Sequence, residues 1–227
     1  MDAFILAAGR GERLRPLTDE LPKPLLRVGE RSLIEHHLHA LKRAGFERII
    51  INHAWLGDKI VATLGDGCSL GLRLHYSAEP EGALETAGGV VNALDLITSD
   101  IFTLVSADIR TDFDFSSLGL EDDADMHLVM VANPAHHAGG DFSVVDGRLR
   151  QVAATGSAYT YAGIGCFRKS LFQHLEPGHR RLRHIIESCI ASGRAAATIF
   201  QGRWMDVGTR QRLAEAERLF LPNAEHP

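Results

Sequence analysis

The first half of the chain alternates short apolar runs with helical patterns, and this alternation restricts the possible folds more than any other feature. Residues 3–8 (AFILAA), 48–53 (RIIINH) and 101–108 (IFTLVSAD) are typical of buried strands. Residues 32–45 have helical apolar spacing, a capping-box Ser-x-x-Glu at the start and a glycine at the end. Strands that alternate with helices predict βαβ units. We therefore expect an α/β fold with a Rossmann-like, mostly parallel sheet flanked by helices.

The second half of the chain departs from this pattern and is predicted to be rich in β-structure. Residues 141–154 (DFSVVDGRLRQVAA) and 159–167 (YTYAGIGCF) have the short apolar runs and glycines that are typical of hairpins. Helical spacing returns at 181–193 and at 209–220. A chain of 227 residues can bury one sizeable α/β core but is short for two full domains. We expect a single domain over residues 1–227.

Charge and cysteine content limit the partners and the environment. The 24 basic and 29 acidic residues give a formal charge of −5, which predicts neither nucleic acid nor an anionic membrane as a partner. No run of 18 apolar residues occurs, and an N-terminus with an acid at position 2 does not suit a signal peptide, so we expect a cytoplasmic protein. Cys68, Cys166 and Cys189 are odd in number and far apart, which favours buried reduced thiols.

The loop after the first predicted strand, LAAGRGERLRPLTDELPKPL, fits neither of the two commonest phosphate-binding patterns. Gly9 and Gly11 match the first two glycines of G-x-G-x-x-G, but Leu14 occupies the third position. A Walker A sequence is also absent. The dinucleotide interpretation, and with it a redox enzyme, is therefore disfavoured.

Basic residues follow these glycines closely. Arg10, Arg13 and Arg15 come first, and Lys23 then stands between two prolines that fix the backbone on both sides. Glycine lets backbone N–H groups approach phosphate oxygens, and the basic side chains supply the opposite charge. The loop is suited to a polyphosphate; a glycine turn beside a solvated basic stretch is the alternative.

The segment LAAGRGERLRPLTDELPKPLLRV resembles the signature of the sugar-1-phosphate nucleotidyltransferases, L-A-A-G-x-G-x-R-L-x-P-L-T followed by P-K-P. The resemblance implies the nucleotide-diphospho-sugar transferase fold, with a nucleotide-binding half over about residues 1–110 and a sugar-phosphate-binding half, including a small β-rich part, over about 111–227. It implies Arg13 and Lys23 as catalytic residues. The nucleotide-binding residues that it implies are Leu6, Ala8, Gly9, Gly11, Glu12, Arg13, Lys23, Gly82 and Ser106.

The reaction of this family brings several negatively charged phosphate groups close together. The enzyme therefore needs positive charge in its active site more than it needs a nucleophilic side chain. A sugar 1-phosphate oxygen attacks the α-phosphorus of a nucleoside triphosphate. The divalent ion that we expect, Mg²⁺, requires carboxylates at the same place. Asp108 follows a predicted central strand, where α/β sheets bind ligands, and Asp206 stands in RWMDVGT before a possible helix cap at Thr209. The family's pattern implies both as metal ligands; a turn residue and a capping residue are the alternatives.

The resemblance also indicates where the sugar binds. Glu85 in EPEGALETAGG, Asp141 in GGDF and Gly163 in YAGIG fall where the family contacts the sugar. A carboxylate can accept from sugar hydroxyls, and a glycine lets the sugar approach the backbone. His136 and His137 lie close to the second of these positions and are further candidates for a sugar contact.

Within the family, INHAWLGDKI, NPAHHAGGDF and RWMDVGT most resemble the uridylyltransferases that act on N-acetylmuramic acid α-1-phosphate in bacterial cell-wall (peptidoglycan) recycling. The resemblance implies UTP as nucleotide and a monomer or small homo-oligomer. Guanylyl transfer to mannose 1-phosphate, thymidylyl or uridylyl transfer to glucose 1-phosphate, and a non-catalytic nucleotide-sugar-binding regulator are the alternatives. The family commonly has Asn-Gly or a similar small pair before the metal Asp, and here that pair is Ser106-Ala107.

Overall fold

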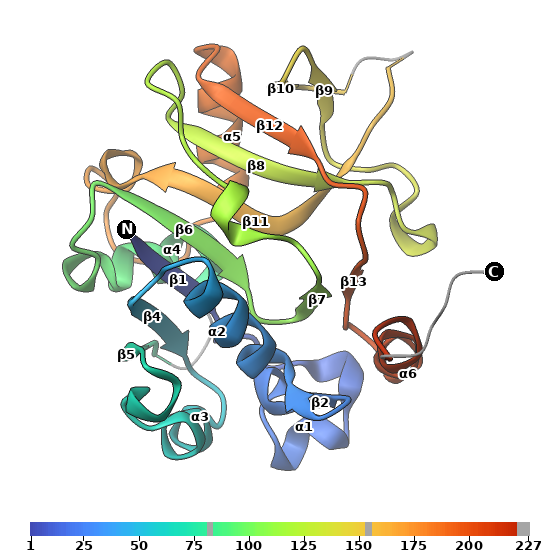
Figure 1. Cartoon of the computed structure of the whole chain (residues 1–227). Helices are drawn as coiled ribbons and strands as arrows, with labels where there is room; N and C mark the ends of the chain where they lie inside the picture. Colours follow the sequence, from blue (N-terminus) through green and yellow to red (C-terminus); the bar gives the residue numbers. More distant parts are fainter. Residues whose placement is uncertain (81–83, 153–155, 222–227) are drawn as a thin grey trace.

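The computed structural model describes residues 1–80, 84–152 and 156–221. Within these residues, nine strands form one central sheet in the order β5-β4-β1-β6-β11-β8-β12-β10-β9 (Figure 1). The strands are β1 (Asp2–Leu6), β4 (Arg48–His53), β5 (Arg73–Ala78), β6 (Ile101–Ser106), β8 (Met126–Val131), β9 (Ser143–Val145), β10 (Arg148–Arg150), β11 (Thr160–Arg168) and β12 (Ala195–Ile199).

The sheet is mostly parallel, as the alternation in the sequence predicts. Strands β5, β4, β1 and β6 run parallel, with Phe4 opposite Ile50 on one side and Leu104 on the other. Strand β11 runs antiparallel between β6 and β8, and β12 returns parallel to β8. The predicted hairpin at 141–154 is confirmed as β9 and β10, which form one edge of the sheet. The carboxyl ends of β1, β4 and β6 therefore meet on one side.

The second predicted hairpin, 159–167, is wrong. These residues belong to β11, one strand that pairs with both β6 and β8 and has an irregularity between Tyr161 and Gly165. Gly163 has φ +74°, and a Cβ there would lie 2.7 Å from the Ser106 Oγ. The glycine therefore permits close strand packing and does not mark a turn.

Helices cover both faces of the sheet. Successive residues of each strand point to opposite faces, so their apolar side chains form two cores, one on each face. One core packs α2 (Leu33–Arg43) and α3 (Gly57–Leu64) against one face, and the other packs α4 (Glu85–Asn92) and α5 (Leu182–Ala191) against the opposite face. In Figure 1, α2 crosses in front of the sheet and α5 lies behind it. Helix α2 begins with the predicted capping box, and its Leu38 and Leu41 are fully buried, each worth about 1.5–3 kcal/mol.

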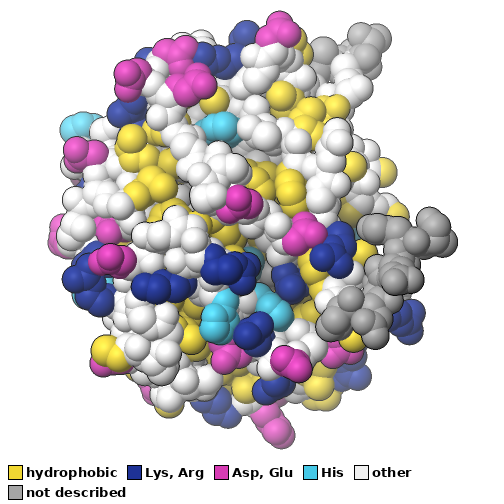
Figure 2. All heavy atoms as spheres, viewed as in Figure 1, with side chains coloured by type: hydrophobic (Ala, Val, Ile, Leu, Met, Phe, Trp, Pro, Cys, Tyr) yellow, Lys and Arg dark blue, Asp and Glu magenta, His cyan; other side chains and the backbone are white. Residues whose placement is uncertain are grey.

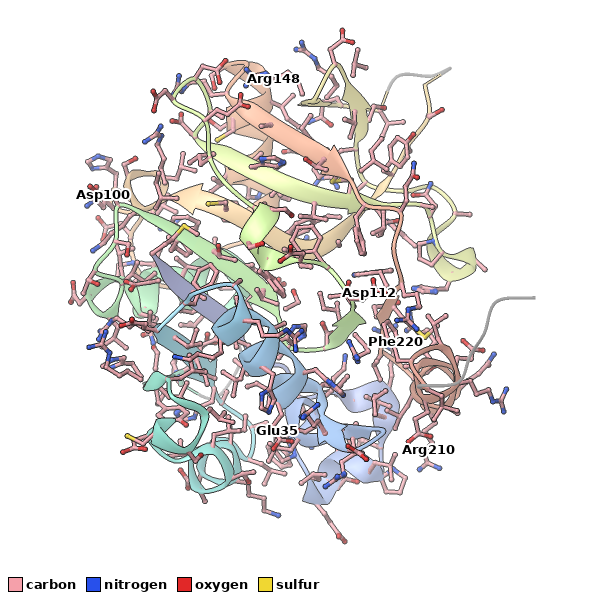
Figure 3. All side chains as sticks on the ribbon, in the orientation of Figure 1. Glu35, Asp100, Asp112, Arg148, Arg210 and Phe220 are labelled. Carbon is pink, nitrogen blue, oxygen red and sulfur yellow. The ribbon has the colours of Figure 1, made fainter. Side chains whose placement is uncertain are left out.

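A third, smaller core joins the N-terminal loop to the C-terminal segment. Leu14 packs there with Val207 and Ala216, close to the short pair β2 (Arg27–Val28) and β3 (Arg31–Ser32). Strand β13 (Trp204–Asp206) pairs with β7 (Ile109–Thr111) and leads into α6 (Arg210–Leu219); the short helix α1 (Leu17–Glu20) follows the glycine loop. Figure 1 shows β13 and α6 beside the N-terminal elements, and Figure 3 shows Asp112 and Phe220 at this junction.

The surface and the cysteines bear on the environment predicted from the sequence. Acidic and basic side chains are interspersed over the face shown in Figure 2. No helix within residues 1–80, 84–152 and 156–221 is both long and apolar enough to cross a membrane. Cys166 and Cys189 are buried as predicted, but Cys68 is exposed, because it lies in the surface turn after α3. The prediction that all three thiols are buried is therefore wrong for Cys68.

Candidate active site

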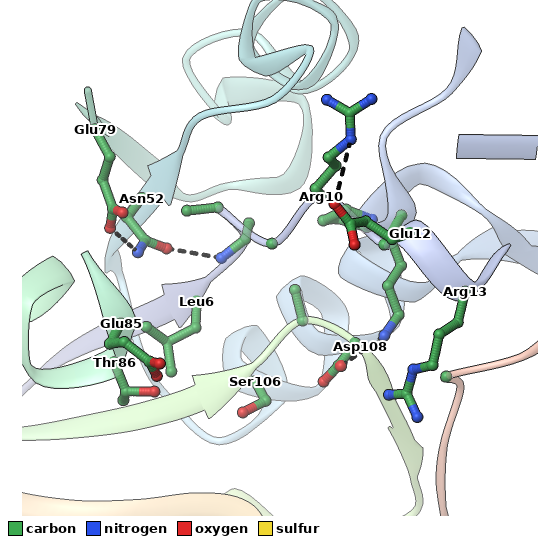
Figure 4. Close-up of a pocket in the computed structure, with 18 of the residues that line it drawn as sticks. Leu6, Arg10, Glu12, Arg13, Asn52, Glu79, Glu85, Thr86, Ser106 and Asp108 are labelled. Atoms are coloured by element: carbon green, nitrogen blue, oxygen red, sulfur yellow. Dashed lines mark hydrogen bonds and ion pairs between the residues drawn. The ribbon is translucent and has the colours of Figure 1, made fainter. Parts of the chain in front are cut away.

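A cavity of about 720 Å³ lies at the carboxyl ends of β1, β4 and β6 (Figure 4). This is where an open α/β sheet places its ligands. Ten residues that the sequence singles out as site residues line it: Leu6, Ala8, Gly9, Gly11, Glu12, Arg13, Lys23, Glu85, Ser106 and Asp108. Asp141, Gly163 and Asp206 are not among the lining residues, and Gly82 lies outside the residues that the structure describes.

The glycine loop is held in a tight turn that only glycine tolerates at one position. Gly11 has φ +70°, and a Cβ there would lie 3.0 Å from Thr18 Cγ2 and 3.1 Å from Lys23 Cβ. Thr18 Oγ1 donates to the Gly11 carbonyl at 2.9 Å. On the outer side of the loop, the Arg10 guanidinium lies 3.9 Å from the centre of the Trp55 ring. The loop is therefore packed on the segment that carries Lys23.

Lys23 is placed by its flanking prolines and by burial. It begins a 3₁₀ turn that contains Pro24, preceded by Pro22 in extended geometry, and the residue is only 8% exposed. Its Nζ donates to Asp108 Oδ2 at 2.6 Å. A buried ammonium group needs such a partner, and the partner here is itself a carboxylate at the end of a central strand. The pair places one positive and one negative group at the cavity wall.

The Arg13 guanidinium lies beside Gly208, two residues after Asp206 in the C-terminal segment. A Cβ on Gly208 would lie 3.0 Å from the Arg13 guanidinium and would overlap the Arg212 guanidinium. Gly208 also lines the cavity. Figure 4 shows the Arg13 side chain among the lining residues. The glycine of RWMDVGT thus leaves room for two guanidinium groups, and Thr209 caps α6 as predicted by accepting from the Arg212 N–H at 3.2 Å.

The backbones of Asp108 and Asp206 are neighbours. Strand β13 pairs Asp206 with Ile109, and the Val207 N–H donates to the Asp108 carbonyl at 2.8 Å. The Asp206 carboxylate binds Arg212 through Oδ2, whereas Oδ1 is buried and accepts no hydrogen bond from the described residues; the His136 Nε2 lies 3.0 Å from it, outside hydrogen-bonding geometry.

These features fit a hard divalent cation. The two carboxylates have adjacent backbones, and one of their oxygens is buried without a donor. Mg²⁺ is commonly held by one or two protein carboxylates and takes its other ligands from water and phosphate. Among the residues with described positions, no group of three or more His, Cys, Asp or Glu side chains could hold a metal ion, so the candidate ligands of these types are Asp108 and Asp206.

A buried polar pair beside the cavity was missed by sequence reasoning. Asn52 Oδ1 accepts from the Ala7 N–H at 2.7 Å, and its Nδ2 donates to Glu79 Oε1 at 2.5 Å. Glu79 Oε2 in turn accepts from the Leu84 N–H at 3.1 Å. Both side chains line the cavity, and they tie the end of β1 to the start of α4 (Figure 4). The signal in the sequence was a polar residue at the carboxyl end of β4.

The two glycines in the middle of α4 are each required by a different close contact. A Cβ on Gly89 would lie 2.5 Å from Glu79 Oε1 and 2.7 Å from Asn52 Nδ2. A Cβ on Gly88 would overlap the Gly178 carbonyl oxygen. The glycines that weaken this helix in isolation therefore let it pack against the polar pair and against a distant segment of chain.

The residues predicted to contact the sugar are divided between two places. Glu85 lines the cavity with φ +61°, an unusual backbone conformation for a residue with a side chain. Asp141 lies farther along, where its Oδ2 accepts from the Tyr161 N–H at 2.9 Å and its Oδ1 lies 3.0 Å from His137 Nε2. Gly163 faces Ser106, which does line the cavity.

Comparisons with known proteins agree with this geometry. The family model described as nucleotidyl transferase matches residues 2–222. The chain is 44% identical over 226 residues to N-acetylmuramate alpha-1-phosphate uridylyltransferase of Neisseria meningitidis, covering 96% of this chain and 98% of that one. It is 29% identical to the protein of the same name from Caulobacter vibrioides, covering 95% of each.

A solved structure supports the fold independently. A Bacillus anthracis protein, named as a glucose-1-phosphate thymidylyltransferase, superimposes with a TM-score of 0.83 at 22% identity and covers 100% of this chain and 98% of its own. The match extends over both halves of the sheet and so includes the strands that border the cavity. The chain belongs to the nucleotidyl transferase family.

Proposed function

We propose that this protein transfers the uridylyl group of UTP to N-acetylmuramic acid α-1-phosphate, giving UDP-N-acetylmuramic acid and pyrophosphate, in the cytoplasmic recycling of peptidoglycan. The observation that carries the proposal is the buried Lys23 paired with Asp108 in a cavity formed by the glycine loop. The 44% identity with a uridylyltransferase of that name supports the choice of nucleotide and sugar.

The reaction is an in-line displacement at the α-phosphorus. A phosphate oxygen of the sugar 1-phosphate forms the new P–O bond, the bond to the β-phosphate oxygen breaks, and pyrophosphate leaves with that electron pair. No covalent intermediate with the protein is required. Arg13 and Lys23 stabilise the charge that develops on the phosphates, and the backbone N–H groups around Gly9 and Gly11 orient the triphosphate.

Asp108 and Asp206 are the residues that would hold Mg²⁺. When bound, the ion supplies a positive charge that neutralises phosphate oxygens. Asp108 accepts from Lys23 and would keep its other lone pairs for the ion, while Arg212 fixes the orientation of the Asp206 carboxylate. Asp108 thereby keeps Lys23 at a fixed position, and Asp206 does the same for Arg212.

The acceptor sugar is oriented by Glu85 in the lining of the cavity and by Asp141 and Gly163 outside that lining. Glu85 accepts from sugar hydroxyls, Asp141 offers a second carboxylate, and Gly163 leaves space beside Ser106. Ser106 stands at the position of the amide residue that the family commonly has, and its hydroxyl replaces one hydrogen bond toward the nucleotide. We propose one domain with these two halves, acting as a monomer or small homo-oligomer.

The proposal is tested by pyrophosphate release from UTP, N-acetylmuramic acid 1-phosphate and Mg²⁺. We expect turnover with this pair and its loss when Mg²⁺ is removed by a chelator. Silence with this pair but turnover with mannose or glucose 1-phosphate would reassign the substrate. Tight UTP binding without pyrophosphate from any sugar phosphate would favour a non-catalytic binding protein.

The role of Asp108 is tested by Asp108→Asn. Removing one of two metal-binding charges should lower kcat by about 10²-fold or more, while circular dichroism shows that the fold stays intact. Glu187→Gln, a charge change on the exposed side of α5, is the matched control. Near-normal rates for Asp108→Asn would remove it from the metal site.

A further inference from the structure

A second cavity, of about 510 Å³, borders the first, and His179 lines both. Its other lining residues come from the start of α5, the segment before it and α4. Four of the lining residues that the structure describes can carry charge, and all four are basic: His179, Arg180, Arg181 and His184. In a chain with a net formal charge of −5, a cavity lined in this way favours an anionic group.

The backbone of this wall is fixed, although its side chains are exposed. The Arg180 N–H donates to the Leu84 carbonyl at 2.9 Å, and the Arg180 carbonyl accepts from the Ala87 and Gly88 N–H groups at 3.1 and 3.2 Å. The contact of Gly88 with Gly178 allows this approach. The first turn of α4, which also borders the main cavity, therefore holds the segment from 178 to 181 in place.

Two of the basic side chains converge on Glu85. The His179 Nε2 lies 3.5 Å and the Arg181 Nε lies 3.6 Å from the same Glu85 Oε1. Both distances exceed those of charge-assisted hydrogen bonds. Within the described part of the chain, Glu85 is the one ion-pair partner of both side chains. The side-chain N–H groups of His179 and Arg181 therefore remain available to donate to a ligand bound beside Glu85.

We propose that Arg181, assisted by His179, binds a carboxylate carried by the acceptor sugar, so that the second cavity selects acidic sugar 1-phosphates over neutral ones. This inference rests on the function proposed above, in which Glu85 accepts from the sugar hydroxyls. A substituent on that sugar then extends past Glu85 to the Arg181 and His179 side chains. The planar guanidinium matches a carboxylate with two parallel hydrogen bonds, whereas a neutral substituent gives it no partner.

The expected effect is a change in selectivity. The kcat/KM of UTP-dependent turnover is measured with N-acetylmuramic acid 1-phosphate and with N-acetylglucosamine 1-phosphate, which lacks the carboxylate-bearing lactyl group. In Arg181→Gln, the ratio of the two kcat/KM values should fall by about 10- to 100-fold, mainly through the KM of the acidic sugar. His179→Gln should lower the ratio by a smaller factor.

Arg183→Gln is the matched control. Arg183 is an exposed arginine two positions along, paired with Glu187 at 2.8 Å and outside both cavities, so its removal makes the same charge change and should leave the ratio unaltered. An equal fall for both sugars in Arg181→Gln, or a fall of the same size in Arg183→Gln, would overturn the inference.

Two outcomes separate this inference from the proposed function. An unaltered enzyme that prefers the acidic sugar, with the same preference in Arg181→Gln, would overturn the inference alone. An unaltered enzyme that turns over only neutral sugar 1-phosphates would overturn both.

Discussion

Gly89→Ala is a substitution in which two physical effects oppose each other. Gly89 lies inside α4, where alanine is intrinsically favoured over glycine by about 1 kcal/mol. The structure places the buried Asn52–Glu79 pair directly against it. Helix propensity alone therefore predicts a more stable protein, whereas the packing predicts a less stable one.

The packing term is the larger. The new Cβ would lie 2.5 Å from Glu79 Oε1 and 2.7 Å from Asn52 Nδ2, so the hydrogen bond between them must lengthen or break. Overpacking costs about 1–3 kcal/mol, and leaving a buried hydrogen-bonding group unsatisfied costs about 1–3 kcal/mol more. After the gain in propensity of about 1 kcal/mol is subtracted, we expect the free energy of unfolding to fall by about 1–5 kcal/mol.

The consequence should extend to activity, because Asn52 also accepts from the Ala7 N–H at the end of β1. Urea unfolding followed by circular dichroism measures the change in the free energy of unfolding, and in thermal unfolding the Tm should fall by roughly 2–20 °C. Gly119→Ala is the control: a Cβ there has nothing within 4 Å, so stability should stay within about 0.5 kcal/mol. A Gly89→Ala protein that is more stable than the unaltered one would refute the role assigned to the polar pair.

Three other changes have distinct expected outcomes. Lys23→Met keeps most of the buried aliphatic stem but removes the ammonium group. The kcat/KM for pyrophosphate release should therefore fall by about 10²–10³-fold. A fall of less than about fivefold would exclude charge stabilisation by Lys23. Ser32→Ala removes the N-cap of α2 and should lower the free energy of unfolding by about 1 kcal/mol in urea titration without altering kcat. With a thiol reagent at pH 8, the exposed Cys68 should react in the native protein. Burial raises the pKa of Cys166 and Cys189 to about 11, so these two thiols should react only after unfolding. Reaction of either one in the native protein would contradict its burial.

The parts of the fold that depend on local pattern could be predicted from the sequence. Apolar runs identified β1, β4 and β6, and the Ser-x-x-Glu spacing identified the start of α2. The hairpin at 141–154 was found because its strands pair through a short turn. The prediction at 159–167 failed because a glycine inside a strand looks the same as a glycine in a turn. Only the position of Ser106 on the next strand distinguishes them.

The candidate site divides in the same way. The glycine loop, Lys23 and Asp108 belong to short segments with fixed spacing, and the structure brings them together. Asn52 has only the weak local signal of a polar residue at a strand end, and Arg181 has none, because both are singled out by contacts across the chain, with Glu79 and Glu85 respectively. Periodicity cannot reveal which distant segment a helix such as α4 will pack against.

The most direct test of the central proposal is a panel of four nucleoside triphosphates against several sugar 1-phosphates, with the nucleotide-sugar product identified by mass spectrometry. We predict the highest kcat/KM for UTP with N-acetylmuramic acid 1-phosphate, and UDP-N-acetylmuramic acid as the product. A higher kcat/KM for GTP with mannose 1-phosphate, or no nucleotide sugar from any combination, would contradict the proposal.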